Sequence, residues 1–449
     1  MNLVIVGAGR VGGNIAKQLS AEQHNIIVVD NNPTVVQALV NGLDVLGIVG
    51  NGSSADILKQ AGVPAADIVL ATMCNDESNI FCSLISKALG AKKTLARVRE
   101  PIYVSQSDFL SDTLGIDVLV NPELETAEEI ARCLRYPWAE HVETINTFMD
   151  IVGVRIELGS PLAGVKLAYL SKEMKLNVLA CAIDRGGDVV IPGGDTAFEV
   201  GDVAFFTGLR QSLAALMRKL GIDTHLRSVL IIGGGRISEY LAGALIETGM
   251  RVKIIEQNRE RCEYLSEKFP RASIVCGDGC SKEVLVEEGI GVADCVASLT
   301  GSDEANILLS LFAKSQKVGK IVTKINGDTF NDFEGALDLG TIVSPRTVLS
   351  EGLIRFTRSM QAPETSGIRA LYKIANDRAE ALAFSINEKS EVADKKIRDL
   401  KIKKGVLIAS LIRGKECIFP DGDTVLRVGD EVLVVSAKYK FKQLKDILA

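Results

Sequence analysis

Short apolar runs alternate with amphipathic stretches along the whole chain. Early in the sequence, six such runs contain almost no polar position: Leu3–Val6, Ile26–Val29, Val45–Val49, Ile68–Ala71, Thr94–Val98 and Val118–Val120. Solidly apolar runs separated by stretches of helical periodicity are typical of strands buried on both faces of a parallel sheet. The pattern therefore predicts an α/β fold with a doubly wound, Rossmann-type parallel sheet.

A smaller region follows this sheet, at about Ile151–Gly208. Polar and apolar positions alternate there, as in IVGVRIEL and VAFFTG, which predicts half-buried strands around a single helix. We expect a compact α+β domain. The helix before it has a clear start signal, with Asn121 as N-cap and Pro122 at the first helical position.

The second half of the chain repeats the first. GNGSSADIL from Gly50 matches GDGCSKEVL from Gly277, and PGGDTAFEVGD from Pro192 matches PDGDTVLRVGD from Pro420. Self-similarity over this distance indicates a tandem duplication of a two-domain unit. The predicted domains are two Rossmann-type domains at 1–135 and 226–360, and two small α+β domains at 136–225 and 361–449.

A glycine motif connects the first strand to the first helix. Gly7, Gly9 and Gly12 form G-x-G-x-x-G, and Asp30 ends the next strand. The first glycine allows a tight turn, the second lets a diphosphate approach the backbone, and the third lets helix and strand pack closely. Asp30 is expected to accept hydrogen bonds from ribose hydroxyls and to repel a 2′-phosphate, which disfavours NADP. The alternative is a packing turn that binds nothing.

The second copy of the motif is altered. It keeps Gly233, Gly235 and Glu256 but has Ser238 in place of the third glycine. A serine there is still compatible with packing, so we expect a second nucleotide site. Because glutamate is longer than aspartate and Arg259 is nearby, the two sites are expected to differ in ligand preference.

The other candidates lie where strands of the sheet end, since those ends line the ligand crevice of such folds. Arg97 is expected to clamp a phosphate in a bidentate fork, and Lys324 to act as a point charge. The alternative for each candidate is a helix cap or a solvated strand end, and for Asp76 and Asp303 it is an N-cap. The candidate nucleotide-binding residues are Gly7, Ala8, Gly9, Arg10, Val11, Gly12, Asp30, Asn51, Gly52, Thr72, Asp76, Asn79, Arg97 and Arg99 in the first copy, and Gly233, Gly234, Gly235, Arg236, Ile237, Glu256, Asp278, Gly279, Thr300, Asp303 and Lys324 in the second.

Composition and charge narrow the classes of function. A net charge of −6 argues against nucleic acid as a partner, because affinity for phosphate backbones needs an excess of lysine and arginine. The 9 cysteines are scattered, which predicts reduced thiols with neither a zinc site nor a disulfide framework. No signal peptide and no run long enough for a spanning helix is predicted, so we expect a cytoplasmic protein.

Catalytic signals are weak. The three histidines, His24, His141 and His225, do not recur between the copies, and no lysine of a phosphate-binding loop follows the glycines. A dehydrogenase needs a positioned proton donor or acceptor beside the nicotinamide. We therefore predict binding without catalysis and no metal site. A soluble nucleotide or redox sensor and, less favoured, an NAD-dependent dehydrogenase remain as alternatives.

With VIVGAGRVG…VVD…GN…AD and PGGDTAFEVGD each present in tandem copies, the chain resembles the RCK (regulator of K⁺ conductance) family, in the form found in regulatory subunits of Trk potassium uptake systems. The resemblance covers essentially the whole chain and departs from the family pattern at Asn51 and Ser238. It implies binding of NAD(H) and of ATP or ADP, and a homotetrameric ring peripheral to the cytoplasmic face of the plasma (inner) membrane. The implied partner is a TrkH- or TrkG-type potassium-translocating membrane subunit, which the ring opens or closes.

Overall fold

The computed structural model describes residues 1–449 apart from 21–23, 147, 170–176, 223–225, 328–336, 338, 362–367, 376–377, 389, 415, 440 and 442. The chain forms two compact units, Met1–Leu134 with Leu226–Ile354 and Arg135–His225 with Arg355–Ala449. Each repeat therefore contributes to both units, and like domains are grouped together. Among the described residues, no helix combines the length and apolar character needed to cross a membrane.

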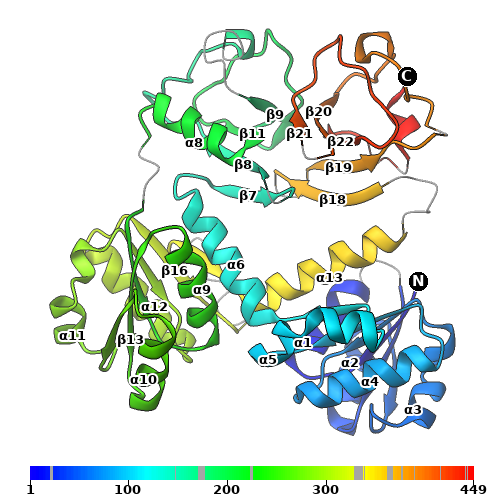
Figure 1. The fold of residues 1–449 in the computed structure, drawn as a ribbon, viewed down its shortest axis with the longest axis vertical. Coiled ribbons are helices and arrows are strands. Elements are labelled where there is room, and N and C mark those ends of the chain that lie inside the picture. Colours follow the sequence, from blue (N-terminus) through cyan, green and yellow to red (C-terminus); the bar gives the residue numbers. More distant parts are fainter. Residues whose placement is uncertain are drawn as a thin grey trace. The chain divides into compact units, whose positions relative to one another are not determined.

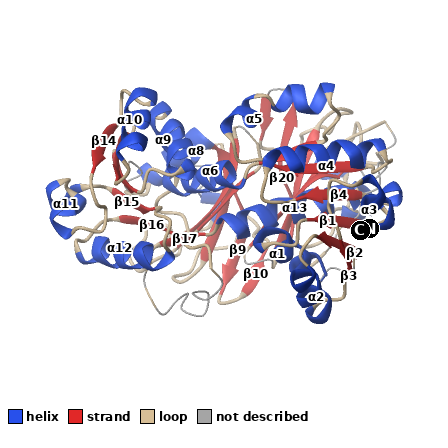
Figure 2. Cartoon of the chain, turned by 90° about the horizontal axis from the view of Figure 1, so that it is seen from below, coloured by secondary structure: helices blue, strands red, loops and turns tan. Residues whose placement is uncertain are grey.

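The first half of the first unit is a six-stranded parallel sheet with strand order β3-β2-β1-β4-β5-β6. Figure 2 shows helices packed along its strands. The expected strands are confirmed to within one residue at each end. The strands are β1 (Asn2–Val6), β2 (Asn25–Asp30), β3 (Leu46–Val49), β4 (Ile68–Ala71), β5 (Lys93–Arg97) and β6 (Val118–Val120), and the helices are α1 (Arg10–Ser20), α2 (Pro33–Gly42), α3 (Ala55–Gln60), α4 (Asp76–Ala88), α5 (Pro101–Ser105) and α6 (Pro122–Arg135).

The second half repeats this sheet with the equivalent order β14-β13-β12-β15-β16-β17. The strand order reverses direction at the same place in both sheets, next to the first strand, which is where such folds bind ligands. The strands are β12 (Ser228–Ile232), β13 (Arg251–Glu256), β14 (Ser273–Cys276), β15 (Cys295–Ser298), β16 (Lys320–Lys324) and β17 (Thr341–Val343), and the helices are α9 (Arg236–Glu247), α10 (Arg259–Lys268), α11 (Lys282–Glu287), α12 (Asp303–Ser315) and α13 (Pro345–Gln361).

Helix α6 belongs to the first repeat but covers the second sheet (Figure 1). It begins at Pro122 as predicted, and the side chain of Asn121 caps it by accepting the Leu124 amide at 2.9 Å. Farther along, Ile130 and Leu134 are buried in one core with strand β12. Burial of an isoleucine or leucine side chain contributes about 1.5–3 kcal/mol. The last helix of the first Rossmann half thus stabilises the second sheet.

Helix α13 makes the reciprocal contact with the first half. The side-chain amide of Asn14 in α1 donates to the Ser350 hydroxyl at 3.2 Å, and Leu349 and Leu353 on the same helix are buried. Both ribbon views place α13 beside α1 (Figures 1 and 2). The two halves have therefore exchanged their final helices, so neither Rossmann half is complete without the other.

The second unit contains two antiparallel sheets of five strands, with orders β10-β9-β11-β8-β7 and β18-β19-β22-β20-β21. They share a core of small and apolar side chains that includes Cys181, Ala182, Ala381 and Ala409. The elements are β7 (His141–Thr144), β8 (Met149–Arg155), β9 (Val178–Arg185), β10 (Asp188–Val190), β11 (Val203–Leu209), α8 (Arg210–Lys219), β18 (Ile368–Ile374), β19 (Ala379–Ser385), β20 (Val406–Arg413), β21 (Glu416–Ile418) and β22 (Glu431–Ser436).

The single helix expected among the strands of each small domain differs between the two copies. In the first, residues 167–169 are helical and 170–176 lie outside the described residues. In the second, the equivalent segment is only a 3₁₀ turn at Ile397–Asp399, so the expectation was wrong there. Helix α8 follows the last strand of its sheet and is not enclosed by strands.

The repeated Gly-Asp pair of the small domains, Gly201-Asp202 and Gly429-Asp430, holds the fold together through its aspartate, and this interaction is called the aspartate clip. Asp202 is buried and accepts from the Arg185 guanidinium at 2.8 and 2.9 Å and from the Glu199 amide at 2.8 Å. Burial by itself raises the pKa of Asp202, but these hydrogen bonds outweigh it and lower that pKa below its usual value. Asp430 and Arg413 repeat the arrangement in the second copy.

Replacing Asp202 by asparagine tests this clip. We expect Asp202→Asn to lower the free energy of unfolding by about 1–3 kcal/mol at neutral pH, because Arg185 loses its charged acceptor. A carboxyl with a lowered folded-state pKa stabilises above its unfolded pKa of about 3.9 and loses that effect as the pH falls. The difference between wild type and variant should therefore shrink below about pH 4 in urea unfolding series. Asp195→Asn, at a fully exposed carboxylate, is the control and should change nothing. Equal stability of Asp202→Asn and wild type at pH 7 would contradict the assignment.

Candidate functional site

The first glycine motif forms a tight turn between β1 and α1. Gly7 has φ +97°, a conformation that favours glycine, and a Cβ on Gly12 would lie 1.9 Å from the Gly7 carbonyl oxygen. A Cβ on Gly9 would meet nothing within 4 Å. The turn thus leaves open space at the position where the motif is expected to admit a diphosphate.

The turn in the second half is closed by a different hydroxyl. In the first half, Thr72 at the end of β4 donates to the Gly7 carbonyl at 2.8 Å. In the second half, Ser238 on α9 is fully buried and donates to the Gly233 carbonyl at 2.5 Å. Thr300, the counterpart of Thr72, bonds Asn306 instead. Ser238 therefore replaces the interaction that Thr72 makes in the first half.

The two strand-end acids hold their glycine turns. Asp30 accepts from the amides of Ala8 at 2.7 Å and Asn32 at 2.8 Å. Glu256 accepts from the amides of Gly234 at 2.6 Å and Asn258 at 2.8 Å. The extra methylene of Glu256 leaves this pattern unchanged. Both carboxylates are half-buried beside the turn, at the position where the sequence predicts a contact with a ribose.

Arg259, which the sequence places near Glu256, is the first residue of α10. It is exposed and pairs with Glu263 one helical turn away. Arg261 is the basic residue at the turn, since its Nε donates to the Gly234 carbonyl at 2.7 Å and its guanidinium pairs with buried Glu239. Glu239, Arg261 and Tyr264 form a cluster in the second half only. The first half has glycine, valine and alanine at the corresponding positions, so comparison of the repeats could not predict this cluster.

The carboxylates at the starts of α4 and α12 shape loops. Asp76 accepts from the amides of Arg99 and Glu100 at 2.7 and 2.8 Å, and Asp303 accepts from those of Asn326 and Gly327 at 2.8–3.0 Å. The N-cap alternative for both was wrong. Asn75 and Ser302 cap these helices, because their side chains accept amide hydrogen bonds from the first turn.

Asn79 and Asn306 tie the ends of neighbouring strands together. Asn79 accepts from the Met73 amide at 2.7 Å and donates to the Arg97 carbonyl at 2.9 Å. Asn306 does the same with the Thr300 amide and the Lys324 carbonyl, each at 2.9 Å. Both side-chain amides are fully buried, and they support the strand ends from behind.

Asn51 and Asp278 form equivalent turns after β3 and β14. Each side-chain oxygen accepts, at 2.9 Å, the amide two residues further on. The glycines that follow lie against the sheet: a Cβ on Gly52 would be 2.1 Å from Val6, and one on Gly279 would be 2.5 Å from Ile232. The replacement of aspartate by Asn51 thus preserves the turn itself.

A central pocket of about 1010 Å³ lies between the two sheets, at the carboxyl ends of their strands. Its lining includes the first residues of α1, α6, α9, α12 and α13. Helix N-termini carry unpaired amides and a partial positive charge, so their convergence favours an anion. Six basic side chains reinforce this preference and face three acids, Glu123, Asp303 and Glu304; the basic residues are Arg10, Arg97, Arg99, Arg236, Lys324 and Arg346.

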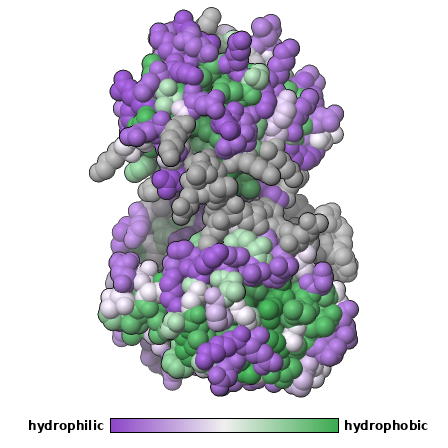
Figure 3. All heavy atoms as spheres, turned by 90° about the vertical axis from the view of Figure 1, so that its right-hand side faces the viewer, coloured by the Kyte–Doolittle hydropathy of each residue, from purple (hydrophilic) through white to green (hydrophobic). Residues whose placement is uncertain are grey.

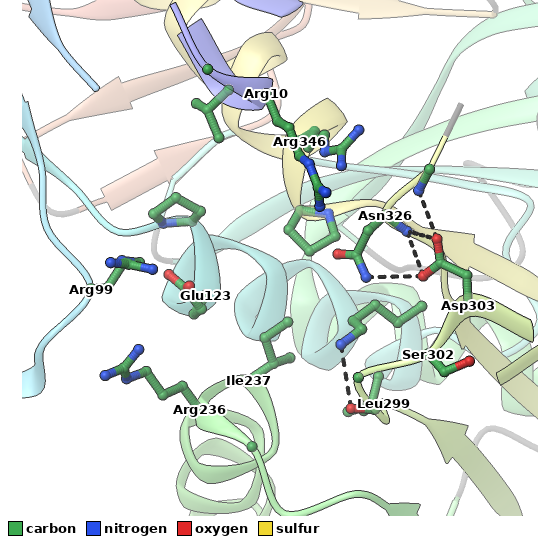
Figure 4. Close-up of a pocket in the computed structure, with 18 of the residues that line it drawn as sticks. Arg10, Arg99, Glu123, Arg236, Ile237, Leu299, Ser302, Asp303, Asn326 and Arg346 are labelled. Atoms are coloured by element: carbon green, nitrogen blue, oxygen red, sulfur yellow. Dashed lines mark hydrogen bonds between the residues drawn. The ribbon is translucent and has the colours of Figure 1, made fainter. Parts of the chain in front are cut away.

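Figure 4 shows Arg10, Arg99, Arg236 and Arg346 around the first turn of α6 at Glu123. Eleven of the residues expected from the sequence line the pocket: Gly9, Arg10, Val11, Thr72, Arg97, Arg99, Gly235, Arg236, Ile237, Asp303 and Lys324. The other expected residues are not among its lining residues; they lie in the glycine turns, at the ends of β2 and β13, in the turns that follow β3, β14 and β15, and in α1 and α4. Glu123 and Arg346 were missed, because they hold equivalent positions after Pro122 and Pro345 with opposite charge.

Two cations in the pocket are poorly compensated. The Nε atom of Arg97 is buried and has no hydrogen-bond partner among the described residues. Burial lowers the pKa of Arg97, although Glu123 and Asp76 act in the opposite direction. Burial also lowers the pKa of Lys324, whose ammonium makes a 3.4 Å hydrogen bond to the Leu299 carbonyl (Figure 4). An anion placed here would relieve the cost of both buried charges.

No histidine is among the residues that line this pocket. His24 lies before β2, His141 begins β7, and His225 is outside the described residues. In the part of the chain that the structure describes, no group of three His, Cys, Asp or Glu side chains is arranged to hold a metal ion.

Comparison with known proteins identifies the repeats. The TrkA-N domain model matches residues 3–122 and 229–345, and the TrkA-C domain model matches 151–221 and 382–449. The chain is 33% identical over 439 residues to the Trk system potassium uptake protein TrkA of Halomonas elongata, covering 97% of this chain and 95% of that protein. It is 32% identical over 448 residues to a TrkA homolog of Archaeoglobus fulgidus, covering 100% of both.

Solved structures share the fold at low sequence identity. The GsuK channel bound to NAD superposes with a TM-score of 0.65 at 19% identity, covering 97% of this chain and 77% of the channel. The GsuK RCK domain gives a TM-score of 0.64 at 20% identity, covering 97% and 92%. The tandem arrangement expected from the sequence, a Rossmann-type parallel sheet followed by a small α+β domain, is thereby confirmed.

Arg97→Met tests whether the pocket is built for a ligand rather than for stability. Removing an incompletely paired buried charge should raise the free energy of unfolding by about 1 kcal/mol without ligand. Arg99→Met is the matched comparison, since Arg99 donates to the Cys74 carbonyl at 2.6 Å and neighbours buried Asp76, and its loss should destabilise. Thermal and urea unfolding of both variants measure the difference. Equal destabilisation by both would mean that Arg97 is a structural residue.

Proposed function

The chain belongs to the TrkA family, and on that basis we propose that it is the nucleotide-binding regulatory subunit of a Trk-type potassium uptake system. The observation that carries the proposal is the central pocket. Two glycine turns from one chain converge there on incompletely paired cations and helix N-termini. Such a site is suited to bind a polyphosphate.

We propose NAD(H) and ATP or ADP as the ligands. The ribose would lie against Asp30 or Glu256, and the phosphates would pass the open side of Gly9 or Gly235 into the pocket. A carboxylate at the ribose disfavours a 2′-phosphate, and hence NADP. The GsuK channel, which shares this fold, has been solved with NAD bound.

Regulation follows from a pocket that both halves share. A ligand shifts a protein between two shapes only by binding one of them more tightly. Phosphates held by Arg97 from β5 and Lys324 from β16 would favour one separation of the two halves. Without ligand, Arg236 of the second half pairs with Glu100 of the first, so a phosphate that attracts Arg236 competes with this ion pair.

We further propose that the chain assembles into a homotetrameric ring on the cytoplasmic face of the plasma membrane, docked on a TrkH- or TrkG-type subunit. Phe81 on α4 and Leu308 on α12 are 53% and 67% exposed at equivalent positions of the two halves. Figure 3 shows apolar surface gathered over the lower part of one face, where the first half lies. Exposed apolar side chains on a repeated element support subunit contacts. The small domains would then act as structural joints.

Nucleotide binding is tested by calorimetric titration with NADH, NAD, ATP and ADP. We expect Asp30→Ala or Glu256→Ala to weaken binding about tenfold or more at its own half, since a charged acceptor of ribose hydroxyls is lost. Asp56→Ala, at an exposed carboxylate on α3, is the control and should bind normally. Unfolding curves recorded alongside show whether each variant retains its fold. Absence of binding by the wild-type chain to all four nucleotides would refute the proposed ligands.

The partner is tested with vesicles that contain a TrkH-type subunit. The purified chain should co-sediment with these vesicles and not with matched empty ones, and NADH, ATP or ADP should change potassium flux through them. Co-sedimentation with neither kind of vesicle would favour a sensor acting on another partner.

A further inference from the structure

The second Rossmann half has a cysteine in α10 where the first half has a valine in α2. Asn32 and Asn258 cap these helices, and each side chain accepts from an amide of the first turn. Val36 and Cys262 each lie four residues after the cap and are both buried. The fold accepts an apolar residue at this position, so a thiol is not needed for packing.

A second valine in the first half is also replaced by cysteine. Strand β3 places Val49 opposite Asp30, and β14 places Cys276 opposite Glu256 in the same parallel register. Val49 is half-exposed, and Cys276 is exposed. Both differences therefore fall beside the acid that ends the second strand of each sheet.

The two cysteines of the second half adjoin each other. The Cys262 thiol donates to the Glu256 carbonyl at 3.2 Å, and Cys276 is the cross-strand neighbour of Glu256. Burial, together with the neighbouring Cys276 thiol, raises the pKa of Cys262 to about 11. Both residues line one open surface pocket of about 620 Å³, whose other lining residues are Arg259, Glu263, Ser266, Glu267 and Ile274.

We propose that Cys262 and Cys276 are a redox modification site that forms a reversible disulfide with low-molecular-weight disulfides as oxidant. The exposed Cys276 thiolate attacks one sulfur of the oxidant, which forms a mixed disulfide and releases one thiol. The Cys262 thiolate then attacks the Cys276 sulfur and releases the second thiol. In total, two protein thiols are oxidised to one disulfide, and one small disulfide is reduced to two thiols.

The Cys262–Cys276 disulfide would make the second half sensitive to oxidation, whereas the first half has valines at both positions. The disulfide removes the Cys262 hydrogen bond to the Glu256 carbonyl and links α10 to the end of β14. The side chain of Glu256 holds the glycine turn through the Gly234 amide. The effect of the disulfide on nucleotide affinity rests on the proposed function, whereas formation of the disulfide does not.

Disulfide formation is tested on the full chain with oxidised glutathione, alkylation of the remaining thiols and peptide mass spectrometry. We expect a linked peptide with Cys262 and Cys276 in wild type and in the matched control Cys280→Ser, lost again on adding dithiothreitol. Cys276→Ser should give no such peptide, and Cys262→Ser should retain glutathione on Cys276. The proposal fails if glutathione remains on Cys276 of wild type as it does in Cys262→Ser, or if Cys276 links to Cys280.

The effect on binding is measured on the Asp30→Ala chain, in which the second half supplies the nucleotide site. Oxidation should weaken binding about threefold or more, as expected for the loss of one hydrogen bond next to the site, and dithiothreitol should restore it. The Cys262→Val/Cys276→Val variant carries the residues of the first half and should not respond. Unchanged affinity after complete disulfide formation would overturn the link to binding. A reduced chain that binds no nucleotide would instead refute the proposed second site.

Discussion

The exchange of α6 and α13 is the constraint on which the first unit depends. Each helix is the last element of its own Rossmann half but packs on the other half, with Ile130 and Leu134 buried against the second sheet and Ser350 bonded to Asn14 of the first half. Separating the halves would expose both apolar helix faces, at about 1.5–3 kcal/mol for each large side chain. The exchange also brings the first turns of both helices, at Pro122 and Pro345, into one pocket.

Positive charge gathers in that pocket, where burial makes it costly. Arg97 and Lys324 are largely buried with few partners, while five helix N-termini add partial positive charge. Burial of a cation costs stability, and nearby carboxylates such as Glu123 oppose that cost. The place of these cations at the strand ends agrees with the proposed anion site. The fully buried Asn79 and Asn306, in contrast, hold the strand ends that carry these cations.

Comparison of the two halves separates what the fold requires from what is particular to one copy. The glycine turn, the acid bonded to its amide and the capped helices are repeated throughout. The hydroxyl on the first glycine comes from Thr72 in one half and from Ser238 in the other, which shows that the interaction matters more than its source. The Glu239 cluster and the Cys262–Cys276 pair have no counterpart, so the second half is the more specialised of the two.

The sequence by itself determined the parallel sheets, their strand limits to within a residue, the duplication and the glycine turns, because these depend on local periodicity and on backbone conformations that few residues adopt. It did not reveal that Asp76 and Asp303 hold loops, that Arg261 rather than Arg259 reaches the second turn, or that Glu123 and Arg346 line the pocket. Those assignments depend on contacts between residues far apart in the chain, such as α6 on the second sheet. Only the tertiary structure decides them, since hydrophobic pattern shows that a helix face is buried and not which repeat buries it.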